Sequence, residues 1–323
     1  MTLDAAVAAV RNSVRRTLLD LTTEGPVVVA CSGGADSLAL LSATVFEGHK
    51  HDRRVLGAVV DHGLQDGSAE HTARVVGQMA GLGVDETVGA RVDVDAAGRG
   101  LEAAAREARY AVLEQVAATF GAAVVLLGHT LDDQAETVLL GLTRGSGGRS
   151  MAGMRESFDV FARPLLGISR AQTEAACRAE DIEFWSDPHN VDPRFTRARV
   201  RHTVLPLLEQ ELGPGVAETL ARTAEQLRPD MELLDDLADL AYLEARVADG
   251  VDLSALAGEP LAVRRRVLRL AALAAGSPSS ELFHVHVRAL ESLSIGEVRG
   301  QVQLPGHVTA VRDSGSLRFR PTI

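Results

Sequence analysis

Six residues that follow an apolar run have the composition of an anion-binding loop. The run Val27–Cys31 leads directly into Ser32, Gly33, Gly34, Ala35, Asp36 and Ser37, and an apolar helical pattern follows without a break. Glycines let the backbone approach an anion closely, and a helix that starts there offers free N–H groups and the positive end of its dipole. The sequence therefore predicts a phosphate-binding turn between a strand and a helix.

The end of this loop indicates which phosphate chemistry it serves. It lacks the Gly-Lys-Ser/Thr ending of the common P-loop, so no residue is placed to hold a γ-phosphate for transfer. Ser32, Gly33, Gly34 and Ser37 would instead surround pyrophosphate as a leaving group, with Asp36 beside it to bind a divalent metal between the phosphates. The alternative is a glycine-rich turn without a ligand.

A second set of candidate residues lies in Gly128–Thr137 (GHTLDDQAET). His129 precedes a helical pattern, and Asp133 and Glu136 are three residues apart, so their carboxylates share one helix face. Like charges this close need a cation between them, either an ammonium group or a metal. The alternative is an acidic helix start that complements the dipole, which accounts for Asp132 and Asp133 but not for Glu136.

An arginine on another helical pattern adds a group that binds carboxylates. Glu102, Arg106 and Arg109 recur at spacings of four and three residues and form one polar stripe. Such a stripe can be an ordinary surface pair of Glu and Arg, but Arg is also the residue that clamps a carboxylate. Two acids for an ammonium and an arginine for a carboxylate describe a free amino acid with a second amine, such as lysine.

Two polar residues follow the second predicted strand. Asp61 and His62 stand in the sequence VDHGL, where the apolar run of that strand ends. At this position they could contact the ribose or base of a nucleotide. They could equally be turn residues with local hydrogen bonds.

One segment reverses the overall charge of the chain. The net charge of -11 argues against nucleic acid as a partner, but a global value can hide a local basic cluster. The segment RFTRARVRH contains Arg194, Arg197, Arg199 and Arg201 and no acid. These arginines could neutralise the phosphates of a nucleic acid. The alternative is a basic helix start that pairs with acids elsewhere in the chain.

The first two hundred residues alternate between strand and helix patterns. Apolar runs predict strands at 26–31, 54–60, 85–92, 122–128 and 160–163. Helical patterns lie between them at 36–46, 69–82, 101–120, 131–142 and 169–180. Several strands are apolar on both faces, which indicates an α/β fold with a doubly wound, mostly parallel sheet. The candidate residues follow the carboxyl ends of strands, where such sheets bind ligands.

The pattern changes after about residue 205. A long helical stretch covers 216–247, and further helices are expected at 261–275 and 280–292. The tail alternates apolar and polar residues around Asp313–Ser316, which predicts a short β-hairpin. We therefore expect a catalytic domain over 1–208, a helical substrate-binding domain over 216–294 and a C-terminal β segment over 295–323.

Composition limits the cellular setting and the redox chemistry. Cys31 and Cys177 are the two cysteines of the 323 residues, and they form neither a CxxC pair nor a disulfide framework. The apolar runs are too short to cross a bilayer, and the amphipathic N-terminus does not have the pattern of a signal peptide. We expect a cytoplasmic protein, and the apolar helices allow a homodimer.

Several blocks of the sequence occur in the order found in one enzyme family. SGGADS, VDHGL, LEAAAREARY, GHTLDDQAETVLL, LTRGSGGRSMAGM, RPLL and DPHNVDPRFTRARVRHTVLPLL make the chain resemble the tRNA(Ile)-lysidine synthetases, which belong to the PP-loop ATP pyrophosphatases. The resemblance spans about Val27 to Leu208. It implies that ATP adenylates the wobble cytidine of tRNA(Ile) with a CAU anticodon, and that free lysine then displaces AMP to give lysidine.

The resemblance also assigns roles to individual residues. By this carry-over, the loop Ser32–Ser37 holds pyrophosphate with Asp36 at Mg²⁺, Asp61, His62 and His129 line the nucleotide and reaction site, and Arg109, Asp133 and Glu136 contact lysine. It also favours contact with tRNA for Arg194, Arg197, Arg199 and Arg201. One departure is visible, because SMAGM at 150–154 stands where the family tends to have Gly-Leu-x-Gly-Met.

Two other functions are compatible with the same loop. A PP-loop enzyme that thiolates tRNA would need a cysteine pair or cluster ligands, which Cys31 and Cys177 do not provide by their spacing. A protein that only senses ATP or holds tRNA would not need Asp36 together with Arg109, Asp133 and Glu136.

Overall fold

The computed structural model describes residues 3–61, 63, 67–92, 101–143, 147–185 and 192–322. The chain divides into two compact units. The first unit consists of Met1–Leu140 and Gly153–Arg222, and the second of Gly141–Ala152 and Thr223–Ile323.

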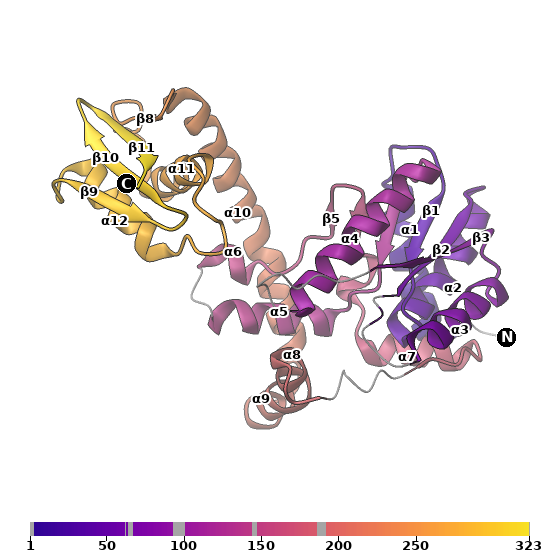
Figure 1. Cartoon of the computed structure of the whole chain (residues 1–323). Coiled ribbons are helices and arrows are strands. Elements are labelled where there is room, and N and C mark those ends of the chain that lie inside the picture. The colour runs from indigo at the N-terminus through magenta and orange to yellow at the C-terminus, as the bar shows by residue number, and fades with distance from the viewer. Residues whose placement is uncertain are drawn as a thin grey trace. The chain divides into compact units, whose positions relative to one another are not determined.

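The first unit is built on a six-stranded sheet with the order β3-β2-β1-β4-β6-β5 (Figure 1). Strands β1, β2, β3, β4 and β6 pair in parallel, and β5 is an antiparallel edge strand. The strands are β1 (Val27–Ala30), β2 (Val55–Asp61), β3 (Glu86–Arg91), β4 (Val124–Leu127), β5 (Ser157–Phe158) and β6 (Phe161–Ala162). This arrangement confirms the predicted α/β fold with a mostly parallel sheet.

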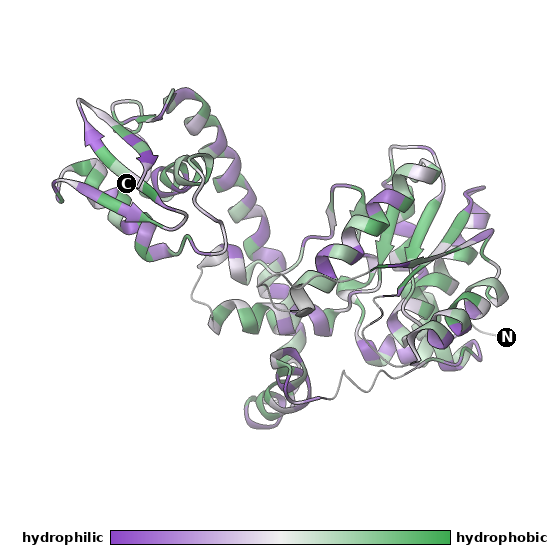
Figure 2. Ribbon diagram, in the orientation of Figure 1, coloured by the Kyte–Doolittle hydropathy of each residue, from purple (hydrophilic) through white to green (hydrophobic). Residues whose placement is uncertain are grey.

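Helices cover both faces of this sheet. Val27 and Val29 of β1 pack into a core with α1, α2, α3 and α7, whereas Val28 and Ala30 pack into a second core with α4. This alternation explains why β1 is apolar at every position, since both of its faces are buried. The hydrophobic colour of the central strands in Figure 2 follows from it. These helices are α1 (Ala5–Leu19), α2 (Ala35–Lys50), α3 (Ser68–Gly81), α4 (Leu101–Phe120) and α7 (Arg170–Ala179).

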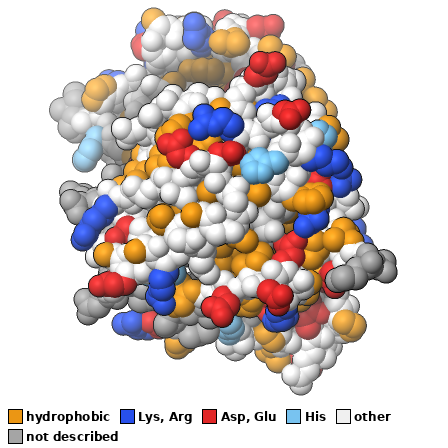
Figure 3. Space-filling view, turned by 90° about the vertical axis from the view of Figure 1, so that its right-hand side faces the viewer, with side chains coloured by type: hydrophobic (Ala, Val, Ile, Leu, Met, Phe, Trp, Pro, Cys, Tyr) orange, Lys and Arg blue, Asp and Glu red, His pale blue; other side chains and the backbone are white. Residues whose placement is uncertain are grey.

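Acidic, basic and hydrophobic side chains are interspersed on the face shown in Figure 3, which displays no single basic patch.

The remaining elements of the first part of the chain are mostly short. They are α5 (Leu131–Thr143), α6 (Gly148–Met151), the 3₁₀ turn η1 (Pro164–Gly167), α8 (Thr196–Arg199), the π-helical turn η3 (Val200–Val204) and α9 (Leu205–Leu212). Of the basic segment, Arg197 and Arg199 thus lie in α8 and Arg201 lies in η3, whereas Arg194 precedes α8.

The second unit combines helices with an antiparallel sheet of order β7-β8-β11-β10-β9. The predicted hairpin is present as β10 and β11, which pair on either side of Ser314. Three further strands extend it, so helices and strands share one core. The elements are α10 (Val216–Ala245), β7 (Arg246–Val247), β8 (Gly250–Asp252), α11 (Leu261–Ala274), α12 (His284–Ile295), β9 (Gln301–Leu304), β10 (Val308–Asp313) and β11 (Ser316–Pro321).

None of the helices in the described ranges combines the length and the apolar character that a membrane span requires.

Candidate active site

The predicted phosphate-binding loop lies between β1 and α2. Gly34 is the N-cap residue of α2, and as a glycine it has no side chain that could cap the free N–H groups at this helix end. Ser37 Oγ accepts a hydrogen bond from the Ser32 amide at 3.1 Å and donates one to the Gly34 carbonyl at 2.9 Å. The loop therefore has the uncapped amides that an anion needs.

The carboxyl end of β4 lies directly against this loop. A Cβ atom on Gly128 would come within 3.1 Å of the Ser37 amide nitrogen and 3.2 Å of the Asp36 carbonyl oxygen. A side chain there would have to push the start of α2 back by a few tenths of an ångström. The close approach brings the start of α5, with its acidic residues, next to the start of α2.

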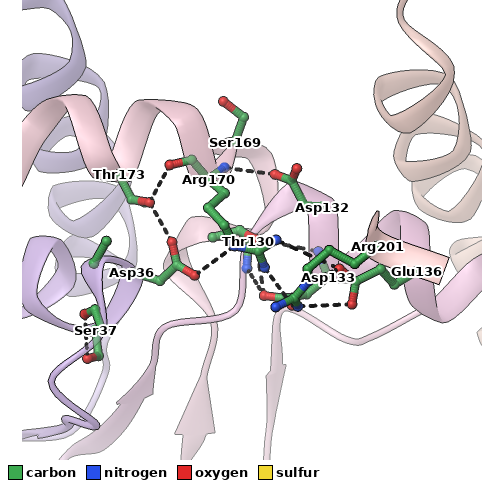
Figure 4. Close-up of polar contacts among 12 residues, drawn as sticks. Asp36, Ser37, Thr130, Asp132, Asp133, Glu136, Ser169, Arg170, Thr173 and Arg201 are labelled. Atoms are coloured by element: carbon green, nitrogen blue, oxygen red, sulfur yellow. Dashed lines mark hydrogen bonds and ion pairs between the residues drawn. The ribbon is translucent and has the colours of Figure 1, made fainter. Parts of the chain in front are cut away.

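Arg170 connects the acids that the sequence placed on two different helices. Its guanidinium lies 3.4 Å from Asp36 Oδ2, 3.1 Å from Asp133 Oδ1 and 3.8 Å from Glu136 Oε1. Asp36 also accepts a hydrogen bond from the Thr173 hydroxyl. In Figure 4, Arg170 lies between Asp36 and Thr173 on one side and Asp132 and Asp133 on the other. The three acids therefore belong to one site with a shared counter-ion.

The sequence analysis did not single out Arg170, although its position follows from local signals. Ser169 and Gln172 form a capping box that starts α7, and the Arg170 amide donates to Asp132 Oδ2 at 2.7 Å. The signal that would have found Arg170 is electrostatic. A group of acids at adjoining strand ends needs a cation, and Arg170 is the first basic residue after η1.

Two arginines of the basic segment lie on the predicted lysine-binding acids. Arg201 Nε is 2.6 Å from Glu136 Oε1, and its Nη2 is 2.9 Å from Asp133 Oδ1. Arg197 Nε is 3.1 Å from Glu136 Oε2. Glu136 is fully buried, with 0% of its side chain exposed. In this conformation guanidinium groups therefore stand where the sequence analysis placed an ammonium group.

The other two arginines of the basic segment make different contacts. Arg194 pairs with Asp192 at 2.6 Å and is largely exposed. Arg199 donates to the carbonyls of Pro193 at 2.7 Å and Arg194 at 3.0 Å. Contact of these residues with tRNA stays a prediction.

The two carboxylates closest to Arg170 differ in their electrostatic environment. Burial raises the pKa of Asp36, and the Arg170 guanidinium and the Thr173 hydroxyl oppose this shift. Burial also acts against ionisation of Asp133, but Arg170, the Thr130 amide and Arg201 outweigh it and lower the pKa of Asp133. The surroundings thus favour the ionised form of Asp133 more strongly than that of Asp36, and a further cation close to Asp36 would stabilise its carboxylate.

Asp36 fits a magnesium ion that is held mainly by substrate. Mg²⁺ usually takes one or two protein carboxylates together with phosphate oxygens and water. No group of three or more His, Cys, Asp or Glu side chains that could hold a metal occurs among the described residues. A metal at Asp36 would therefore take most of its ligands from bound phosphates.

His129 lies among arginines and is neutral. Burial lowers the pKa of His129 from 6.5 to about 3, and the nearby cations Arg163, Arg106 and Arg109 add to the effect while Asp133 opposes it. Arg163 Nε donates to His129 Nδ1 at 3.2 Å. Because Arg is always a donor, Nδ1 accepts and the proton of the neutral ring is on Nε2. His129 can therefore donate a hydrogen bond from Nε2 but does not carry a charge near neutral pH.

Acid should destabilise the first unit through His129. The unfolded chain binds a proton near pH 6.5 and the folded chain only near pH 3, so stability falls as the pH drops between these values. The expected slope is about 1.4 kcal/mol per pH unit. His129→Asn should flatten the dependence of the unfolding temperature on pH in this range, whereas His51→Asn at an exposed position should not. Equal slopes for both variants and the parent would contradict the assignment.

Arg109 is a half-buried cation near the loop and His129. Burial lowers the pKa of Arg109, and this guanidinium in turn acts on the pKa of Cys31 and of His129. No ion pair joins it to a carboxylate among the residues that the structure describes. It does not touch Asp133 or Glu136, so its part in binding lysine stays a prediction.

The remaining predicted nucleotide contacts are Asp61 and His62. Asp61 is buried at the end of β2, and its Oδ1 accepts a hydrogen bond from the Gly63 amide at 2.8 Å. This contact is the local turn bond that the sequence analysis kept as an alternative. His62 lies outside the described residues.

Both cysteines are buried thiols. Burial raises the pKa of Cys31, and it raises the pKa of Cys177 to about 12. A thiolate is therefore disfavoured at both positions, which argues against thiol chemistry at this site.

Comparison with known proteins identifies both parts of the chain. A model of the PP-loop domain matches residues 7–208, and a model of the TilS substrate binding domain matches residues 252–318. A solved structure of a U34-tRNA thiolase from Methanococcus maripaludis shares the fold. Its TM-score is 0.56 at 18% identity, and the match covers 69% of this chain and 79% of the thiolase.

Curated relatives match over nearly the whole length. A tRNA(Ile)-lysidine synthase from Thermobifida fusca is 51% identical over 314 residues, which cover 96% of both proteins. The enzymes of the same name from Streptomyces coelicolor and Salinispora arenicola are 47% and 49% identical and cover 98% and 96% of this chain. A loop for phosphates beside paired acids, a full-length match at this level of identity and both domain models agree, and the chain belongs to the tRNA(Ile)-lysidine synthase family.

Proposed function

We propose that this protein ligates lysine to position 2 of the wobble cytidine in tRNA(Ile) with a CAU anticodon, at the expense of ATP. The observation that carries the proposal is the junction of α2, α5 and α7. There, uncapped amides that suit phosphates lie beside Asp133 and Glu136, which already hold cationic groups. A nucleotide and an amine could thus be bound within one site.

The reaction that fits this site has two steps. In the first, the 2-carbonyl oxygen of cytidine attacks the α-phosphorus of ATP, the P–O bond to the β-phosphate breaks, and pyrophosphate leaves. In the second, the side-chain amine of lysine attacks C2, the C–O bond to the adenylate breaks, and AMP leaves. The pyrimidine carbonyl has no leaving group of its own, and adenylation supplies one.

The loop residues would serve the first step. The amides at the start of α2 would bind the departing pyrophosphate, since charge that develops there meets preoriented donors. Magnesium, when bound, would neutralise the phosphates, and Asp36 is the residue that would hold it. The neutral His129 would donate from Nε2 to a phosphate oxygen without the charge of an imidazolium.

The acids and Arg109 would serve the second step. Asp133 and Glu136 would bind the side-chain ammonium of lysine, and either carboxylate would take the proton that the amine must lose before it attacks. Arg109 would hold the α-carboxylate of lysine, because its guanidinium has no carboxylate partner among the described residues.

For this to happen, Arg201 and Arg197 have to release the acids. Phosphates of a bound tRNA are competing partners for both guanidinium groups, which agrees with the tRNA contacts predicted for this segment. Exchange of partners would leave Asp133 and Glu136 with Arg170 and free to bind an ammonium. Binding of lysine would thereby depend on tRNA.

A labelling experiment tests the proposal directly. We expect labelled lysine to enter unmodified tRNA(Ile) with a CAU anticodon in the presence of ATP and Mg²⁺, and not to enter an elongator methionine tRNA with the same anticodon. Incorporation into neither tRNA would contradict the assigned reaction. Cytoplasmic location and a homodimer complete the proposal, and light scattering of the purified protein tests the dimer.

A further inference from the structure

We infer that His71 and the backbone amide of Trp185 are positioning groups that aim two amides of the loop at the bound phosphates. The inference rests on the proposed function, in which Ser32–Ser37 holds these phosphates. Both residues lie in the first unit, His71 on α3 and Trp185 after α7. Neither was a candidate in the sequence analysis.

Two consecutive carbonyls of the loop are held from outside. His71 Nε2 lies 3.0 Å from the Ser32 carbonyl oxygen, and the Trp185 amide donates to the Gly33 carbonyl oxygen at 2.9 Å. A carbonyl oxygen only accepts, so Nε2 of His71 carries the proton and the tautomer of the ring is fixed.

The peptide bond converts these contacts into an orientation of the amides. In a trans peptide the C=O and the following N–H point in opposite directions from one plane. A Ser32 carbonyl held toward His71 therefore turns the Gly33 N–H away from α3, on the side where it also meets the Cys31 thiol. A Gly33 carbonyl held toward Trp185 likewise turns the Gly34 N–H away from Trp185. Successive amides turned in this way form an anion-binding concavity.

Close packing leaves no space for a side chain between the loop and α3. Gly33 has φ +81°, and a Cβ atom there would lie 2.7 Å from Val75 Cγ2 and 3.2 Å from His71 Cε1. Because His71 and Val75 are four residues apart, they present one face of α3 to the loop. Gly33 thus sits directly on the residue that orients its amide.

The His71 ring is itself held in place on its other side. The ring centroids of His71 and Trp185 are 4.1 Å apart, with an angle of 42° between their planes. Gln78, on the same helix, donates to the Glu183 carbonyl at 2.8 Å and ties α3 to the same segment. The second contact does not reach the loop, so it provides a matched control for the first.

The experiment compares three variants of the full chain by calorimetric titration with ATP and Mg²⁺, and with inorganic pyrophosphate. His71→Phe keeps a ring beside Trp185 but loses the donor, and should weaken binding of both ligands about fivefold to tenfold, the effect of losing one hydrogen bond. His71→Gln retains a donor at the position of Nε2 and should bind within about twofold of the parent. Gln78→Leu should bind like the parent. The KM for lysine should not change in any of them.

The sole tryptophan of the chain gives an independent readout. Because Trp185 bonds to the loop, its fluorescence should change as ATP saturates the parent, and the midpoint should move to higher ATP in His71→Phe. Parent-like binding by His71→Phe, or equal weakening in all three variants, would overturn the inference. If His71→Phe binds ATP like the parent while Asp36→Asn binds it more weakly, the inference about His71 fails but the proposed role of the loop in phosphate binding stands. If the parent binds neither ATP nor pyrophosphate, the proposed role of the loop fails.

Discussion

Asp36→Asn should lower lysidine formation at least about a hundredfold, because the variant loses the carboxylate that we propose holds a cation against the departing phosphates. Asn can still accept the hydrogen bond from Thr173, so the start of α2 should keep its structure. The defect should lie in the first step. Release of pyrophosphate in a single turnover with ATP and tRNA should therefore fall in parallel with incorporation of lysine.

Asp52→Asn is the matched control for this variant. Asp52 is exposed after the other end of α2 and has φ +53°, a conformation that Asn tolerates as well as Asp. It should retain parent activity. Asp36→Asn with parent rates of pyrophosphate release would show that no metal or phosphate depends on this carboxylate.

Glu136→Gln should separate the two steps of the reaction. Release of pyrophosphate should continue, while the KM for lysine should rise about a hundredfold, as expected for loss of one member of a buried charge pair. The variant should also be less stable by about 3 kcal/mol, because Arg201 and Arg197 would face a neutral partner in a buried position. Single-turnover assays at saturating ATP and thermal unfolding measure the two effects.

Two further variants test this prediction, one as a control and one with the opposite expected effect. Asp132→Asn removes an equal charge from the same helix but can still accept the bond from the Arg170 amide, so it should leave the KM for lysine near the parent value. Arg201→Met should shift binding in the opposite direction, with tighter binding of lysine in the absence of tRNA. A KM that rises equally in Glu136→Gln and Asp132→Asn would indicate a general effect of charge and not a lysine site.

Much of the first unit could be predicted because its strands have strong local signals. β1 is apolar at all four positions, and it ends at a glycine-rich turn, so both its burial and its ligand-binding end can be read from the chain. The predicted helix at 101–120 coincides with α4, and the one at 131–142 differs from α5 by a single residue. The periodicity of apolar residues and the turn residues at its ends suffice to predict an element that is long and buried.

The contacts of the arginines could not be predicted in the same way. The sequence shows a basic segment and an acidic helix, but pairing Arg201 with Glu136 requires a contact across 65 residues. The choice between a partner within the chain and a phosphate outside it depends on which state the protein occupies. In this conformation Arg197 and Arg201 pair with acids of the same chain, which is the alternative that the sequence analysis had left open for the basic segment.

Two short strands of the second unit also escaped the sequence analysis. β7 and β8 have two and three residues, too few to show an alternating pattern, and β7 follows directly on a long helix. They become strands because a partner is available, since Leu317 pairs with Val251 and buries it. Tertiary pairing decides the structure of segments this short.

The order of the strands in that sheet has a consequence for biosynthesis. β11, the last of the five strands to be made, lies inside the sheet between β8 and β10. When synthesis has reached residue 315, β8 still lacks the partner that β11 will provide. By then every strand of the sheet in the first unit has been made. Domains generally fold as units during synthesis, with the N-terminal one first. The nascent chain should acquire its catalytic half early and complete its second half only once the final strand has emerged.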